Sequence, residues 1–313
     1  MSGALARYLD GSPRGRLHLQ HGPIDLLIGL DDAHRGCDVD DMRQRAYRTA
    51  WERFSTILDE LVRELPLLRR PAKPNGPLPN GAVARRMVRA TEPFAADYFI
   101  TPMAAVAGAV ADEILAAMLR AFGSGDRPER IYVNNGGDIA VHLDRSAAFR
   151  VGMSREDGAA FGALTLSADD PARGVATSGR GGRSLSMGIA DSVTVVAADA
   201  AAADAAATLI ANAVDLPGHS AIARAPADSV VDDSDLGDRL VVTGCGALAA
   251  DEIDLALRAG LDKAELFIRQ GLIDRSALFL GREGRLAGRP APGESAFPTP
   301  TSDNQTTRPL HHA

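Results

Sequence analysis

Runs of apolar residues predict the strands of this chain. Residues 130–143 (RIYVNNGGDIAVHL) read as two strands, because Asn-Asn-Gly-Gly between them supplies the residues that a tight reversal requires. The β-branched run SVTVVA at residues 192–197 predicts a buried strand. The predicted strands and hairpins occupy residues 16–30, 130–143, 149–153, 161–167, 192–197, 239–245 and 277–286.

Apolar residues at helical spacing, or alanine-rich stretches, predict four helices. Thr101-Pro102 is a typical helix start, with a capping residue followed by proline in the first turn. Prolines crowd residues 66–80, so the first helix is expected to stop there and a linker to follow. A kink is expected at Gly260. The predicted helices occupy residues 41–68, 101–122, 201–214 and 251–273.

The order of these elements predicts the fold class. Strands follow strands more often than they alternate with helices, which favours an α+β fold with a mostly antiparallel sheet layered against helices. We expect one domain over residues 1–287 and a disordered tail over 288–313, where Pro, Ser, Thr and Gly dominate. Residues 1–14 and 216–238 are expected to be loose or looped.

The composition of the chain argues against several classes of function. A formal net charge of -7 argues against nucleic-acid binding, which usually needs a basic face. The two cysteines, Cys37 and Cys245, form no CxxC or Cys/His cluster, so neither a disulfide framework nor a zinc site is expected. No apolar run is expected to reach the ~18 residues of a membrane helix. Without a secretory pattern at the start, the sequence predicts a cytoplasmic protein with no membrane partner.

A glycine-rich loop and the helix after it carry the candidate chemistry. In TSGRGGRS, residues 177–184, glycine amides could form an anion-binding concavity, with Arg180 and Arg183 contacting phosphate oxygens. Asp204 and Thr208 are four residues apart on one helix face and offer the hard oxygens that Mg²⁺ prefers. The alternatives are an ordinary glycine loop, and a helix start in which Asp204 caps the first turn and Thr208 packs by its methyl group.

The Asn-Asn-Gly-Gly-Asp turn, residues 134–138, also leaves two interpretations open. The need for positive φ in a tight turn explains the glycines completely. It explains Asp138 less well, since this acid stands at the mouth of an apolar strand. Asp138 and Asp191 are therefore candidates for orienting polar groups of a ligand.

Four segments in the same order resemble the ApbE-like superfamily, whose founding members are FAD:protein FMN transferases. The resemblance spans roughly residues 95–215. It rests on AAVAGAVAD at 104–112, NNGGD at 134–138, ATSG at 176–179, and SVTV at 192–195 with ADAAAT at 203–208.

The resemblance implies a T-fold-like architecture, a FAD ligand, and Mg²⁺ held by Asp204, Thr208 and a backbone carbonyl near Ala107. The cofactor-binding positions that it and the glycine-rich segments suggest are Asn135, Gly136, Gly137, Asp138, Thr177, Ser178, Gly179, Arg180 and Arg183.

The chain departs from the active flavin transferases at two places. Their His-x-x-Asp-Pro-x-x-Gly motif is replaced by GRGGRSLSMGIAD, residues 179–191, which has neither His nor Pro. Their Lys after the alanine of the small-residue segment is missing, since Ala107 is followed directly by Gly108. The chain therefore looks more like the cytoplasmic branch of the superfamily, and no catalytic residue is assigned.

Three functions stay open from the sequence. The first is an enzyme that binds a flavin or related dinucleotide with Mg²⁺ and transfers FMN to an acceptor protein or cleaves the pyrophosphate of FAD. The second is a non-catalytic flavin- or nucleotide-binding module. The third is a pterin- or purine-type enzyme on the same fold. A small-molecule nucleotide is the expected ligand in the first two cases, and edge strands with thin helices would suit a homodimer.

Overall fold

The computed structural model describes residues 3–9, 11–12, 14–32, 38–123, 125–145, 147–154, 160–182 and 184–288. Nine strands form one sheet in the order β1-β2-β3-β4-β5-β8-β9-β12-β13, and every neighbouring pair is antiparallel. Its strands are β1 (Leu5–Tyr8), β2 (Leu17–His21), β3 (Ile24–Asp31), β4 (Arg130–Asn135), β5 (Asp138–Leu143), β8 (Gly174–Ser178), β9 (Ser192–Ala197), β12 (Arg275–Leu280) and β13 (Glu283–Ala287).

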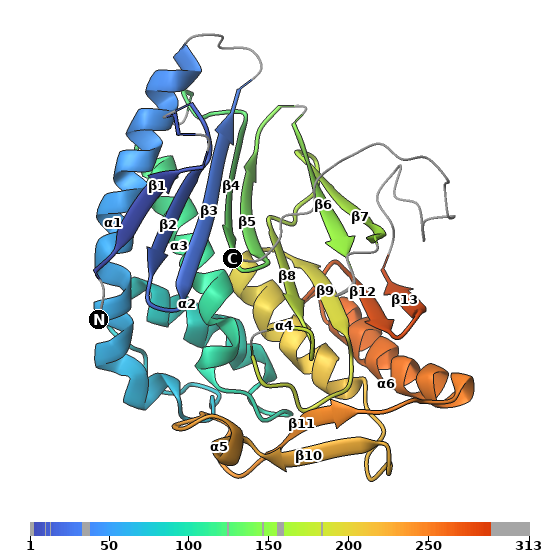
Figure 1. The fold of residues 1–313 in the computed structure, drawn as a ribbon. Coiled ribbons are helices and arrows are strands. Elements are labelled where there is room, and N and C mark those ends of the chain that lie inside the picture. The colour runs from blue at the N-terminus through green and yellow to red at the C-terminus, as the bar shows by residue number, and fades with distance from the viewer. Residues whose placement is uncertain are drawn as a thin grey trace.

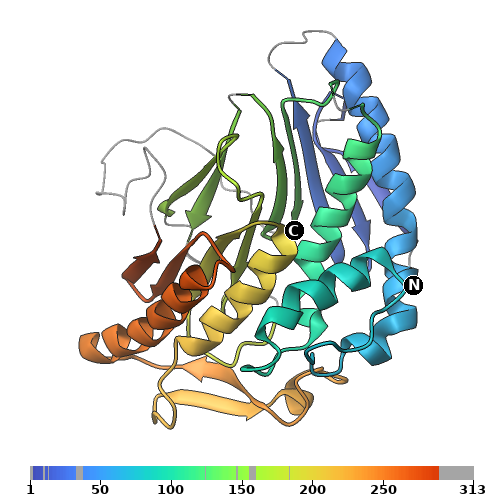
Figure 2. The same cartoon turned by 180° about the vertical axis from the view of Figure 1, so that it is seen from behind.

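Helices cover one face of this sheet (Figures 1 and 2). Each long helix lies on its own pair of strands: α1 on β2 and β3, α3 on β4 and β5, α4 on β8 and β9, and α6 on β12 and β13. A mixed fold with a large antiparallel sheet layered against helices confirms the predicted fold class. The helices are α1 (Asp38–Leu68), α2 (Ala82–Thr91), α3 (Val106–Arg120), α4 (Ala200–Ala213), α5 (Ala227–Val230) and α6 (Ala250–Arg269), with 3₁₀ turns η1 (Glu92–Phe94) and η2 (Pro102–Ala105).

Two hairpins stand apart from the large sheet. Strands β6 (Ala148–Ser154) and β7 (Ala160–Ser167) interrupt the chain between the neighbours β5 and β8. Leu164 and Leu166 of β7 pack against Val141 of β5 and Val175 of β8, so this hairpin covers part of the face opposite the helices. Strands β10 (Ile222–Pro226) and β11 (Leu240–Cys245) form the second hairpin, below α4 and α6 in Figure 1.

Several elements differ from the sequence prediction. Residues 1–14 contain β1, which exists because it pairs along β2, and the expected loop at 216–238 contains β10 and α5. Helix α2 was missed. Its Val83, Ala84 and Met87 are buried, but the helix has only 10 residues and follows the proline-rich segment. It packs on α3, α4 and η2 as an outer layer.

Other differences concern single residues. The first helix ends at Leu68, as predicted, but it includes Pro66 and begins at Asp38, three residues before the predicted start. Helix α6 runs through Gly260 as one helix, where a Cβ would lie 2.3 Å from a side-chain carbon of Val214. Close packing, rather than a kink, therefore explains this glycine.

One helical stretch, Pro102–Arg120, is long and apolar enough to cross a membrane, which the sequence analysis did not expect. Its apolar window is 67% buried inside the protein. Ala109, Val110 and Ile114 lie in the main core, between the sheet and the helical layer. The apolar surface of this stretch is thus used for packing within the fold.

The predicted tail lies almost wholly outside the described residues, which end at Gly288. Arg183 and Cys37 also lie outside them.

Candidate functional site

Three segments that are far apart in sequence meet at the end of β4. Asn135, the last residue of β4, donates its side-chain N–H to the carbonyl oxygen of Ala107 at 3.1 Å. The next residue on α3, Gly108, donates its backbone N–H to Oδ2 of Asp204 at 3.1 Å. The small-residue segment, the Asn-Gly-Gly-Asp turn and α4 therefore lie side by side, as a common ligand site would require.

The approach of α3 to α4 depends on small residues. A Cβ on Gly108 would lie 2.2 Å from the carbonyl oxygen of Ala200, closer than real Cβ atoms come. Asp112, one turn further along α3, accepts the backbone N–H groups of Ala200 at 3.1 Å and Ala201 at 2.9 Å. Those N–H groups have no partner within their own helix, so α3 supplies part of the cap of α4.

Among the residues that the structure describes, no cationic side chain forms an ion pair with Asp204. Burial, and then the negative charge of Asp138, raise the pKa of Asp204 well above its usual range. The backbone N–H groups of Gly108 and Ala107 lower this pKa, but by less. A cation between the two carboxylates would favour the ionised form of both.

Asp138 stands where β5 and β8 separate. The ladder between these strands contains only the pairs Ile139–Val175 and Ala140–Gly174. Beyond it, Oδ1 of Asp138 accepts the backbone N–H of Thr177 at 3.1 Å. The carboxylate thus continues the pairing of two strands, and its charge also raises the pKa of Asp204. The turn geometry alone did not explain this acid.

The glycines of the turn have the conformation that the sequence predicted. Gly136 and Gly137 have φ values of 66° and 116°. The backbone N–H of Gly137 donates to the side-chain oxygen of Asn134 at 2.8 Å. The turn itself explains these residues, and their role toward a ligand stays a prediction.

The glycine-rich loop follows β8, which ends at Ser178. The side chain of Arg180 forms an ion pair with Oδ1 of Asp191 at 2.5 Å. The other oxygen of Asp191 accepts the backbone N–H of Gly281 at 2.6 Å. Arg180 therefore already has an anionic partner, and Asp191 ties the loop to the turn between β12 and β13.

The predicted metal ligands are all oxygen donors: the carbonyl of Ala107, the carboxylate of Asp204 and the hydroxyl of Thr208. Thr208 is half-buried on α4, one turn after Asp204, and its hydroxyl makes no hydrogen bond to any described residue. Within the described ranges no group of three or more His, Cys, Asp or Glu side chains could hold a metal. One carboxylate with neutral oxygens is a donor set that suits Mg²⁺, which keeps several waters or phosphate oxygens.

Asp112 is the residue that the sequence analysis overlooked. Its side chain is buried, and burial, followed by the charge of Asp199, raises its pKa to about 7. Arg86 and the two backbone N–H groups act in the opposite direction. An acid within the apolar run AAVAGAVAD was the available clue, because a buried carboxylate needs donors from another segment.

A family model and two relatives match this chain over different shares of its length. A family model described as AbpE bacteria matches residues 6–289. A UPF0280 protein of Methanosphaerula palustris is 36% identical over 181 residues, which is 56% of this chain and 70% of that protein. A UPF0280 protein of Methanopyrus kandleri is 41% identical over 130 residues, or 42% of this chain. The aligned part spans only 48% of the M. kandleri protein's length.

The solved structure of the flavin transferase ApbE from Vibrio cholerae aligns with 92% of this chain and 97% of that one, at 13% identity and a TM-score of 0.32. The family model covers far more than half of the chain, which agrees with the resemblance carried by the four sequence motifs. The chain therefore belongs to the ApbE-like family described as AbpE bacteria.

Proposed function

We propose that this protein binds a flavin nucleotide together with Mg²⁺ between β4–β5, α3 and α4. One observation carries the proposal. The contacts of Asn135 with Ala107 and of Gly108 with Asp204 bring three motif segments of the ApbE-like family together. The family of the chain and its flavin transferase members supply the ligand class.

The donor chemistry fits Mg²⁺. Ala107, Asp204 and Thr208 would hold the ion through a carbonyl, a carboxylate and a hydroxyl oxygen. The pKa of Asp204 is raised by burial and by Asp138, so a bound cation would relieve a repulsion that this site contains. When bound, Mg²⁺ would neutralise charge on the pyrophosphate of the nucleotide.

Each surrounding residue has a role that follows from its contacts. Asn135 fixes the direction of the Ala107 carbonyl, which is the backbone oxygen proposed as a ligand. Asp138 holds the backbone of Thr177 at the start of the glycine-rich loop. Arg180 is already paired with Asp191, so it would contact phosphate through the guanidinium N–H groups that this pair leaves.

The reaction is the less constrained part of the proposal. FMN transfer to an acceptor protein, or cleavage of the FAD pyrophosphate, would need groups that replace the missing His and Lys of the active transferases. The loop GRGGRSLSMGIAD offers hydroxyl and guanidinium groups instead. A non-catalytic flavin-binding module is the second candidate, favoured by the same departures.

The test is a titration of the purified protein with FAD, with and without Mg²⁺, followed by analysis of the products. We expect Mg²⁺-dependent binding in the wild type and its loss in Asp204→Asn. Asp199→Asn is the matched control, because it makes the same change at an exposed position of the same helix and retains a capping residue.

Release of AMP would identify the protein as an enzyme. Tight binding of FAD without any product would identify it as a non-catalytic flavin-binding module. Failure to bind FAD under either condition would overturn the flavin assignment. Direct binding of a pterin or purine nucleotide would then identify the third class of ligand.

A further inference from the structure

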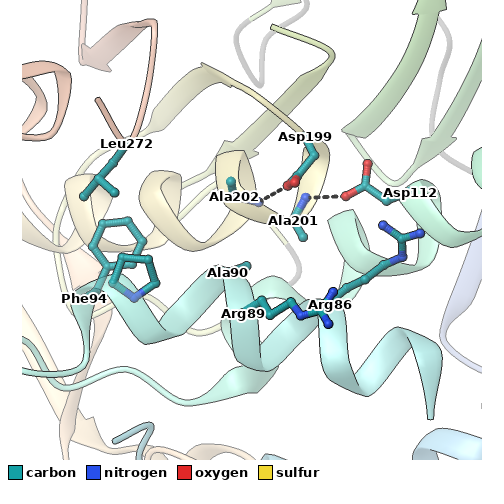
Figure 3. Close-up of a pocket in the computed structure, with 10 residues that line it drawn as sticks. Arg86, Arg89, Ala90, Phe94, Asp112, Asp199, Ala201, Ala202 and Leu272 are labelled. Carbon is teal, nitrogen blue, oxygen red and sulfur yellow. Dashed lines mark hydrogen bonds between the residues drawn. The ribbon is translucent and has the colours of Figure 1, made fainter. Parts of the chain in front are cut away.

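A separate cavity lies on the outer side of the helical layer, between α2 and the first turn of α4 (Figure 3). Its volume is about 180 Å³. None of the residues proposed for the flavin site lines it. The residues that do are Arg86, Arg89, Ala90, Pro93, Phe94, Asp112, Asp199, Ala201, Ala202 and Leu272.

Two arginines give this cavity unused hydrogen-bond donors. Arg86 and Arg89 are three residues apart on α2, so both side chains lie on the same side of that helix. Arg86 donates only its Nε to Glu113, at 3.2 Å, and its two terminal nitrogens make no hydrogen bond within the described part of the chain. Arg89 forms no ion pair or hydrogen bond with any described residue.

The acidic groups of the cavity are already engaged. Asp112 accepts two backbone N–H groups, one on each oxygen. Figure 3 shows the bond from Ala201 to Asp112 and the bond of 2.8 Å from the backbone N–H of Ala202 to Asp199. These bonds also occupy the free N–H groups at the start of α4. The donors that remain for a ligand are therefore the two guanidinium groups, and not the helix end.

The remaining wall is apolar and limits the size and charge of a ligand. Phe94 and Leu272 line the side of the cavity away from Asp112 (Figure 3), and Pro93 is a further lining residue. A volume of about 180 Å³ suits a small molecule rather than a nucleotide. A doubly charged phosphate would meet Asp199 and Asp112, whereas a singly charged, planar carboxylate matches the fork of an arginine.

We infer that this cavity is a second ligand site, which binds a small organic carboxylate. The carboxylate lies on Arg86 and Arg89, and the hydrocarbon part lies on Pro93, Phe94 and Leu272. The ligand touches Ala201 and Ala202, which precede Asp204 on the same helix. The site does not depend on flavin binding, since it shares no residue with the proposed flavin site.

The experiment is a calorimetric titration of the full chain with hexanoate, with inorganic phosphate and hexylamine as comparison ligands. We expect hexanoate to bind, and Arg89→Gln to weaken it by about tenfold or more, because a charged hydrogen bond is lost. Arg85→Gln is the control. It removes an exposed arginine from the same helix, outside the cavity.

Backbone amide NMR locates the bound probe. Hexanoate should shift the signals of Ala201 and Ala202 in the wild type and leave them unmoved in Arg89→Gln. Arg89 is exposed and pairs with no residue of the described ranges, so this variant is expected to fold, and its melting temperature checks that. Equal affinity in the wild type and Arg89→Gln, no binding of hexanoate, or equally strong binding of phosphate or hexylamine would each overturn the inference.

Discussion

Gly108 and Asp204 are joined by a hydrogen bond of 3.1 Å from a backbone N–H to a carboxylate oxygen. The bond links α3 to α4 at the point where the proposed metal ligands lie. It requires the two helices to approach so closely that only glycine fits at position 108. Packing of the core and assembly of the candidate site thus depend on the same contact.

Replacing Gly108 with alanine should therefore separate the two helices. Its Cβ would lie 2.2 Å from the carbonyl oxygen of Ala200, which is a backbone atom and cannot rotate away. We expect a loss of roughly 1–3 kcal/mol in the free energy of unfolding, measured by urea denaturation, together with weaker FAD binding. Gly123→Ala is the control, since nothing lies within 4 Å of its Cβ. Equal stability of the two variants would contradict the helix contact.

Asn135→Ala should lower stability and weaken ligand binding together. Asn135 is 5% exposed, and its side chain bonds both the Ala107 carbonyl and, at 3.4 Å, the backbone N–H of Asp25. Leaving these groups without a partner should cost about 1–3 kcal/mol in the free energy of unfolding. Gln20→Ala removes an exposed amide from β2 and should have no comparable effect. Unchanged FAD affinity in a folded Asn135→Ala would speak against the proposed role of Ala107.

Asp112 should make stability depend on pH in an unusual direction. Burial, and then the charge of Asp199, raise its pKa from 3.8 to about 7 in the folded protein. Between these two pH values the folded state holds a proton that the unfolded state has lost. The contribution of this group to stability is therefore complete below about pH 4 and decreases as the pH rises to about 7.

Asp112→Asn cannot lose that proton. The stability of the variant relative to the wild type should therefore increase as the pH is raised from about 4 to about 7, and stay constant above. Thermal melts of both proteins across this range measure the difference. A difference that is independent of pH would show that Asp112 titrates at the same pH in the folded and unfolded chain.

Glu113→Gln should destabilise the helical layer. The Glu113 side chain is 6% exposed and lies between the guanidinium groups of Arg53 at 2.9 Å, Arg86 at 3.2 Å and Arg120 at 3.7 Å. Removing its charge leaves three cations together, and we expect a loss of about 3 kcal/mol in the free energy of unfolding. Glu265→Gln, which breaks an exposed pair with Arg269, should cost less than about 1 kcal/mol. Similar losses of stability in both variants would contradict the conclusion that the buried carboxylate of Glu113 neutralises the surrounding arginines.

The sequence by itself determined the elements whose signals are local. Alanine-rich α4, the β-branched strand β9 and the turn at Gly136-Gly137 each follow from the preferences of consecutive residues. The same segments carried the family resemblance. The α+β class also followed from the order of strands and helices, because that order limits how the layers can stack.

The tertiary structure decided which distant segments of the chain lie next to one another. Asp112 caps a helix 88 residues away, Asp204 meets Gly108 across 96 residues, and β1 exists only along β2. No local pattern encodes these contacts, because they depend on the strand order that places β5 next to β8 and on the small residues that let α3 and α4 touch. The tertiary structure also decided the partner of Arg180. The sequence suggested that this cation binds phosphate, whereas in the fold it forms an ion pair with Asp191.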